Sequence, residues 1–351
     1  MLQYVWTKLY AGWLRSQLVR ERPRVVLRHG EGRNLILGIA RNYSIQDLRP
    51  FVRSARKFHD CRIVLVIDNN PDLGKALEAE GVDCVLLDVA SALGRPHMNF
   101  ARITDYVAVL QALSGQIDRV FLADTRDVVF QSDIFKALPD EPIIFFEEAH
   151  GFALATAGWN GNAIRRTFGE HVFDAIKHHE VICSGTVLAR HDIALMYCWE
   201  KLLLGQLVDR RHHMRSGVDQ ATTNVIARVD LVPRSVVMPY DGAVATLSGN
   251  NTDFLSVRAG LMRTASGQIP AAIHQYDRNS EVRDFVYATY DGPMAGKAGD
   301  RSKDSTLQKK LRRALKTDAA IRCSCLCQQS GTRLLLRIFP SAARSKSSGL
   351  W

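Results

Sequence analysis

Short apolar runs alternate with amphipathic segments along the first part of the chain. The apolar runs predict β-strands, and apolar residues spaced three and four apart predict helices. The predicted strands cover residues 34–40, 61–70, 82–89 and 119–124, and the predicted helices cover residues 45–58, 72–81 and 101–113. This alternation predicts βαβ units, and the near-continuous apolar strands indicate a mostly parallel sheet with helices on both faces.

Beyond Phe135 the pattern is less regular. The sequence predicts strands over 141–150 and 182–190, a helix over 191–207, and a helix that begins near Asp219. The segment 162–181 fits helix or loop, and the segment 269–279 fits a short strand or loop. The whole chain is therefore interpreted as an α/β protein.

Composition and charge divide the chain into three parts. Apolar residues make up 46% and charged residues 23% of the 351 positions, as in ordinary globular proteins. We expect a basic N-terminal helix over 1–30, a folded domain over 31–291, and a basic, partly disordered tail over 292–351. The net charge is +10, and the excess of basic residues lies in the two ends. Peripheral contact with an anionic membrane and simple solubilisation both explain such ends, and nucleic acid is not an expected partner.

The cellular location of the protein is predicted from features that its sequence lacks. No apolar run is long enough for a membrane-spanning helix, and the N-terminus has no apolar core typical of a signal peptide. The seven cysteines show no disulfide framework. The thiols of "CSCLC", residues 323–327, do not have the usual spacing of zinc ligands. These features predict a cytoplasmic protein, for which peripheral association with a membrane is the alternative.

The stretch "ADTRD" interrupts two apolar runs with charged side chains. It lies where a parallel sheet binds ligands, at the carboxyl end of a strand. For Asp124 and Asp127 to serve one ligand, the strand must end and the chain must turn between them. Two adjacent carboxylates need a compensating cation, such as Mg²⁺ or Mn²⁺. An ordinary Asp-rich turn is the alternative, and Arg126 is open between a salt bridge and a phosphate contact.

No glycine-rich phosphate fingerprint follows the first strand, so neither a dinucleotide-binding Rossmann fold nor a Walker ATPase is indicated. Instead, "VFLADTRDVVFQ" resembles the DxD region of nucleotide-sugar glycosyltransferases of the GT-A fold. The later "CSGTVLAR", "GVDQATTN" and "IHQYD" follow in the order seen in retaining enzymes of the glycogenin and galactosyltransferase type. The resemblance covers residues 34–290 and implies a Rossmann-like GT-A domain.

The resemblance also implies a reaction: transfer of a sugar from a nucleotide-diphosphate donor to an acceptor, for which an envelope or lipid-linked glycan is one candidate, with retention of configuration. It assigns the metal, Mn²⁺ or Mg²⁺, to Asp124, Asp127 and His274. It assigns catalysis to Asp219 and Gln220. It assigns donor binding to Ala40, Asn42, Tyr43, Arg102, Arg126, Ser184 and Gly185.

The sequence departs from the family pattern in its aspartate spacing, which is Asp-Thr-Arg-Asp and not Asp-x-Asp. Cys183 stands where the pattern often has Asn, and no Lys-Pro-Trp run follows His274. An inactive carbohydrate-binding protein on the same fold, or a metal-dependent phosphohydrolase, are the alternative functions. Locally, His274 fits a packed core histidine, and Asp219 fits a helix N-cap.

Overall fold

The computed structural model describes residues 23–87, 98–148, 151–207, 217–248 and 251–292, together with Gly12 and Ser16. Contacts divide the chain into Met1–Pro293 and Met294–Trp351. The predicted basic tail, apart from its first residue, and the "CSCLC" segment lie outside the described residues, as does most of the predicted N-terminal helix. Within the described ranges, no helix is both long enough and apolar enough to cross a membrane.

The predicted N-terminal helix is wrong for residues 23–30, which have no helical structure. Their side chains alternate between partly buried and exposed positions, and Val25 and Leu27 pack on the core. The segment is held by Asp83, whose carboxylate accepts hydrogen bonds from the backbone N–H of Arg28 at 3.1 Å and of His29 at 3.3 Å. Packing of alternate side chains therefore overrides the helical pattern.

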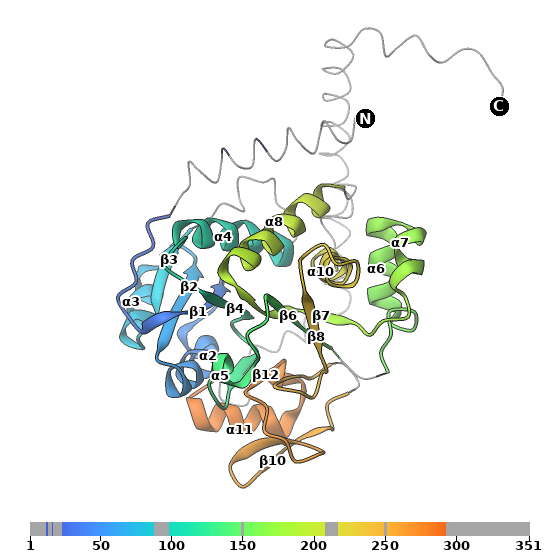
Figure 1. Ribbon diagram of the computed structural model, residues 1–351. Coiled ribbons are helices and arrows are strands. Elements are labelled where there is room, and N and C mark those ends of the chain that lie inside the picture. The colour runs from blue at the N-terminus through green and yellow to red at the C-terminus, as the bar shows by residue number, and fades with distance from the viewer. Residues whose placement is uncertain are drawn as a thin grey trace, which may run out of the picture. The chain divides into compact units, whose positions relative to one another are not determined.

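A seven-stranded sheet forms the centre of the domain, in the order β3-β2-β1-β4-β7-β6-β8 (Figure 1). Strand β7 runs antiparallel to both of its neighbours, and every other pairing is parallel. The strands are β1 (Glu31–Ala40), β2 (Cys61–Ile67), β3 (Asp83–Leu86), β4 (Arg119–Asp124), β6 (Ile143–Glu147), β7 (Ile182–Arg190) and β8 (Ser235–Met238). The mostly parallel α/β sheet predicted from the sequence is confirmed.

Helices cover both faces of this sheet, as predicted. The described helices are α2 (Ile45–Phe58), α3 (Pro71–Ala79), α4 (Met98–Ala112), α5 (Ile134–Ala137), α6 (Gly158–Phe168), α7 (Glu170–Ile176), α8 (His191–Leu207), α10 (Val218–Arg228) and α11 (Ser280–Tyr290). Leu35 and Leu37 of β1 face the apolar cluster of α4, α8 and α10. Ile36, between them, faces the cluster of α2 and α3. Strand alternation thus builds two cores on one sheet.

Local signals explain why several predicted bounds are confirmed. Helix α2 begins at Ile45 because Ser44 and Asp47 form a reciprocal capping box. Helix α3 is followed by Gly81, whose φ of +81° suits the left-handed position after a helix. Strand β4 ends at Asp124, where the apolar run stops.

A second, three-stranded sheet joins distant parts of the sequence. It consists of β5 (Val128–Phe130), β12 (Ala272–His274) and β9 (Val244–Thr246), with β12 in the middle. A separate hairpin follows β9 along the chain, formed by β10 (Leu255–Arg258) and β11 (Leu261–Thr264). The sequence pattern predicted β12 as a strand or loop, and it missed β8, β9, the hairpin and α11.

Buried Gln131 ties this small sheet to the hairpin. Its amide nitrogen donates to the carbonyl oxygens of Met262 at 2.9 Å and Pro270 at 3.1 Å. Its amide oxygen accepts from the Met262 N–H at 2.7 Å. The Gln131 side chain therefore makes the hydrogen bonds to the backbone of β11 that a neighbouring strand would otherwise make.

Replacing this glutamine should destabilise the protein. We expect Gln131→Ala to lower the free energy of unfolding by about 2–3 kcal/mol, because it leaves buried backbone groups of Met262 without a partner. Urea denaturation measures the change. The control Gln116→Ala removes an exposed amide and should shift stability by less than about 0.5 kcal/mol. Equal effects of the two changes would contradict the account.

Candidate metal centre

The carboxyl ends of β1 and β4 lie side by side in the middle of the large sheet. Ile39 pairs with Asp124 in the parallel ladder between them. From β1 the chain continues to β2 and β3 on one side, whereas β4 lies on the other side. This is a topological switch point, where open α/β sheets bind their ligands.

The chain turns sharply between the two aspartates. Strand β4 ends at Asp124 and β5 begins at Val128, so the predicted end and turn are confirmed. The turn is fixed by Thr125, whose hydroxyl donates to the Ile39 carbonyl at 2.9 Å. Gly38 makes room for this threonine, because a Cβ there would lie 2.2 Å from the Thr125 methyl group.

Strand pairing brings His274 to the same turn, although it is distant in sequence. Strand β12 runs antiparallel to β5, with His274 opposite Val128. The next residue, Gln275, donates its N–H to the Asp127 carbonyl at 2.6 Å. The hydrogen bonds between β12 and β5 therefore fix the position of His274 beside Asp127.

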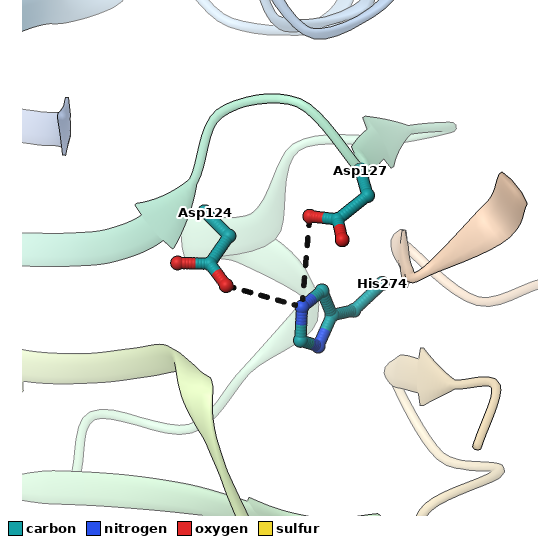
Figure 2. Close-up of side chains that lie close together, drawn as sticks. All are labelled: Asp124, Asp127 and His274. Atoms are coloured by element: carbon teal, nitrogen blue, oxygen red, sulfur yellow. Dashed lines mark ion pairs between the residues drawn. The ribbon is translucent and has the colours of Figure 1, made fainter. Parts of the chain in front are cut away.

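Asp124, Asp127 and His274 converge on one point (Figure 2). The His274 Nε2 atom lies 3.7 Å from Asp124 Oδ2 and 3.8 Å from Asp127 Oδ1. All three potential ligand atoms lie within 4.8 Å of one another. The cluster can hold a metal ion, and the displaced aspartate spacing does not prevent both carboxylates from reaching it.

The imidazole of His274 is fully buried, but its Nε2 has no hydrogen-bond partner among the described residues. Its neighbours on that side are the two carboxylates, which lie at ion-pair distance. Its Nδ1 lies 3.4 Å from the Cys183 sulfur, which fixes the ring. The carboxylates of Asp124 and Asp127 keep 29% and 14% of their surface exposed, so the cluster is open on their side. His274 is therefore a buried histidine whose Nε2 faces the two carboxylates, as a metal ligand would.

Gly185 leaves the space that the cluster occupies. A Cβ on Gly185 would lie 2.4 Å from His274 Cε1 and 2.7 Å from Asp124 Oδ2. These distances are far below van der Waals contact, so only glycine fits here. The small residue that the resemblance assigned to the donor pocket thus lines the candidate metal centre as well.

The charges of the cluster balance one another. Burial raises the pKa of Asp124, but Arg102 and His274 outweigh it and hold the pKa below the ordinary value. Burial raises the pKa of Asp127, and the nearby Asp124 adds to the rise against the effect of His274. Burial lowers the pKa of His274, yet Cys183 and the two carboxylates raise it well above its ordinary value. The charged His274 thus balances the carboxylates, and a divalent cation that binds here would take the place of its proton.

Asp219 lies at the centre of a second charged network. Its Oδ1 accepts a hydrogen bond from the buried Lys201 ammonium group. Its Oδ2 accepts from Arg102 at 3.0 Å and from the Ser184 hydroxyl at 3.1 Å. Arg102 also pairs with Asp124, which links the two networks. The interpretation of Asp219 as a helix N-cap is wrong, because Gly217 caps α10 and Asp219 points to these groups.

Lys201 is a residue that the sequence reasoning missed. It also donates to the Thr223 hydroxyl at 2.9 Å and to the Tyr197 hydroxyl at 3.2 Å. Burial lowers its pKa, but Asp219 raises it more, so the amine is charged. The available signal was a lysine, beside Glu200, within the mainly apolar stretch "YCWEKLLLG" of the predicted helix.

The remaining predicted residues surround the cluster. Arg126 pairs with Asp127 at 3.3 Å and with Asp277 at 2.9 Å, so the salt bridge that the sequence left open is present. Tyr43 is half-buried; burial raises its pKa, and the charges of Arg126 and Asp127 act on it as well.

The other two residues at the end of β1, and Gln220 on α10, lie at the same edge of the sheet. Ala40 is buried in the core, whereas Asn42 is exposed and donates its N–H to Asp68 at 2.5 Å. Gln220 donates from its amide nitrogen to Glu148 at 2.6 Å.

Comparison of the chain with protein-family models and with curated protein sequences finds no match in either. The class of the protein is therefore defined by its fold and its candidate site alone. It is an α/β protein with a Rossmann-like, mostly parallel sheet and a candidate divalent-metal centre at its switch point.

A methyl group at Gly185 should disrupt the centre. We expect Gly185→Ala to weaken Mn²⁺ binding about 10- to 100-fold, as changes beside metal ligands commonly do, because the Cβ displaces His274 or Asp124. Isothermal titration calorimetry measures this. The matched control is Gly74→Ala in α3, where a Cβ would be 3.5 Å from Ile67, an ordinary contact. The control should bind Mn²⁺ normally and gain about 0.5–1 kcal/mol of stability. Undiminished binding in Gly185→Ala would refute the assignment.

Removing the charge of Lys201 should destabilise the fold. We expect Lys201→Met to lower the free energy of unfolding by about 3–5 kcal/mol, because it leaves part of the Asp219 charge buried without compensation. The double variant Lys201→Met with Asp219→Asn should recover part of this loss. The control Lys136→Met removes an exposed partner of Asp133 and should change stability by less than about 1 kcal/mol. A loss that the second change does not reduce would argue against a charge pair.

Proposed function

We propose that the chain is a metal-dependent glycosyltransferase of the GT-A type, which transfers a sugar from a nucleotide-diphosphate donor to an acceptor glycan with retention of configuration. The observation that carries the proposal is the convergence of Asp124, Asp127 and His274 at the switch point of the sheet. Four separate sequence motifs meet there, in support of the resemblance on which the proposal rests.

The donor set of the cluster fits a divalent cation. Two carboxylate oxygens and one imidazole nitrogen would hold Mn²⁺ or Mg²⁺, and the nitrogen favours Mn²⁺ because Mg²⁺ prefers oxygen ligands. When bound, such a cation would neutralise the donor diphosphate and stabilise the nucleoside diphosphate as it leaves. This supports a diphosphate substrate in a fold that lacks a glycine-rich phosphate loop.

The side chains around the cluster would hold the rest of the donor. Tyr43, at the end of β1, would stack on the base. Arg126 would offer a guanidinium to the diphosphate, since 45% of its side chain is exposed. Ser184 and Gly185 would border the sugar, which can approach the backbone where Gly185 has no side chain. These positions surround the carboxyl ends of β1 and β4.

Asp219 would stabilise the positive charge that grows on the sugar in the transition state. Both of its oxygens already accept hydrogen bonds from Lys201, Arg102 and Ser184. A carboxylate held in this way is suited to electrostatic stabilisation and poorly suited to nucleophilic attack, because three of its roughly four acceptor positions are engaged. We therefore propose that Asp219 acts through its fixed charge, with Arg102 linking it to the metal ligand Asp124.

The proposal predicts a metal-dependent gain in stability on donor binding. A nucleotide sugar at about 100 times its Kd should raise the free energy of unfolding by about 2.7 kcal/mol in the presence of Mn²⁺, and should have little effect in its absence. A thermal-shift screen of nucleotide sugars with and without Mn²⁺ measures this. Asp127→Asn should abolish the gain, because it removes one ligand of the cation.

The matched control is Asp118→Asn, which changes an exposed aspartate at the opposite end of β4. This variant should keep the full metal-dependent gain. The proposed function is wrong if no nucleotide sugar stabilises the wild-type protein with Mn²⁺, or if Asp127→Asn responds like the wild type.

A further inference from the structure

The indole of Trp159 lies beside the helix that carries Asp219 and Gln220. Trp159 is near the start of α6, and half of its surface is exposed (50%). Its ring atoms Cζ2 and Cη2 lie 3.1 and 3.2 Å from where a Cβ of Gly217 would be. Gly217 is the N-cap residue of α10. Single exposed apolar side chains are common, so it is the position of this one that requires an explanation.

Two polar side chains accompany the indole. Gln220 lies in the first turn of α10, three residues after Gly217, against which the Trp159 ring packs. Its amide nitrogen donates to Glu148 at 2.6 Å, and both side chains are partly exposed. A flat aromatic ring, an amide and a carboxylate are therefore placed around the start of α10.

This group faces the edge of the sheet that bears the candidate metal centre. Glu148 directly follows β6, which runs in the same direction as β4 because both are antiparallel to β7. The ends of both strands therefore point to one edge. On α10, Gln220 is the immediate neighbour of Asp219, whose carboxylate is linked to Asp124 through Arg102. The group is thus connected to the candidate metal centre through Gln220, Asp219 and Arg102.

We propose that Trp159, Gln220 and Glu148 form an acceptor subsite for the pyranose ring of an uncharged sugar. The C–H face of a pyranose packs on an aromatic ring, while its hydroxyls bond to carboxylate and amide groups, so the two kinds of side chain match the two sides of the ligand. The Glu148 carboxylate disfavours a phosphate or an acidic sugar through repulsion of like charges. The inference rests on the proposed glycosyltransferase function and adds the class of its acceptor.

Saturation-transfer NMR on the full-length protein with Mn²⁺ tests the subsite. The probes are uncharged methyl glycopyranosides of the common hexoses and N-acetylhexosamines, with methyl glucuronide and inorganic phosphate as charged comparisons. At least one uncharged glycoside should bind the wild type, with the strongest saturation on protons of one C–H face. Trp159→Ala should weaken that binding about tenfold or more, and Trp159→Phe should weaken it less, because a smaller ring remains.

The matched control is Met196→Ala, which removes an exposed apolar side chain from α8. Its glycoside affinity should equal that of the wild type. Glu148→Gln should relax the discrimination against methyl glucuronide, which a merely structural glutamate would not do. Thermal melting of each variant confirms that it is folded, and Trp159→Phe keeps the test valid if Trp159→Ala is not.

The inference is overturned if no uncharged glycoside binds the wild type, or if Trp159→Ala and Met196→Ala bind it equally. Tighter binding of phosphate than of glycosides would replace it with an anionic acceptor. The nucleotide-sugar thermal shift separates the two claims. Donor binding without glycoside binding refutes only the subsite, whereas glycoside binding at Trp159 without any donor binding refutes the transferase and leaves a carbohydrate-binding protein.

Discussion

The candidate site depends on one strand pairing, that of β12 with β5. Only three residues on each strand take part, yet the pairing places His274 opposite Val128 and so next to Asp127. It also closes the small sheet over the turn that follows β4, where Gln131 adds side-chain hydrogen bonds to the hairpin and to the segment before β12. Without this pairing the two aspartates would form an ordinary charged turn at the end of a strand. The position of the histidine is thus a consequence of tertiary structure.

Charge compensation is the second constraint on the site. The carboxylates Asp124, Asp127, Asp219 and Asp277 are set against the fixed cations Arg102, Arg126 and Lys201 in two groups of ion pairs. His274 joins the two groups through Asp124 and Asp127. Arg102 joins Asp124 to Asp219, and Lys201 fixes the other oxygen of Asp219 from within the core. His274, whose pKa is raised, supplies the fourth positive charge, and a divalent cation that binds here would take the place of its proton. The same network holds each carboxylate in position before any ligand arrives, which is what electrostatic catalysis requires.

Local sequence patterns predicted the part of the fold that local interactions determine. The apolar runs of β1, β2 and β4, the capping box of α2 and the polar ends of the strands were sufficient for the sheet, its helices and its ligand-binding edge. The hairpin, β8, β9 and α11 were missed because they are short or stabilised by contacts with distant residues, such as the bonds of Gln131. The orientation of β7 could not be predicted either, since strand direction depends on the connections between strands and not on side-chain pattern.

The site shows the same division. Asp124 and Asp127 could be selected from a single stretch, and His274 from the order of motifs that resemble a family. Lys201 and Trp159 could not, because a lysine in an apolar helix and an exposed tryptophan acquire meaning only when α8, α10 and α6 pack together. The interpretation of residues 23–30 as helix failed for a similar reason: their contact with Asp83 and the core is not visible in the local pattern.

The central claim is that Asp124, Asp127 and His274 together bind the cation that holds a nucleotide diphosphate. Crystals grown with Mn²⁺ and a nucleoside diphosphate test it most directly, through anomalous scattering at a wavelength where manganese contributes strongly. The account predicts one strong anomalous peak within coordination distance of both carboxylates and of His274 Nε2, in contact with the diphosphate oxygens. A diphosphate bound without a peak at this position, or a manganese peak that His274 does not touch, would contradict it.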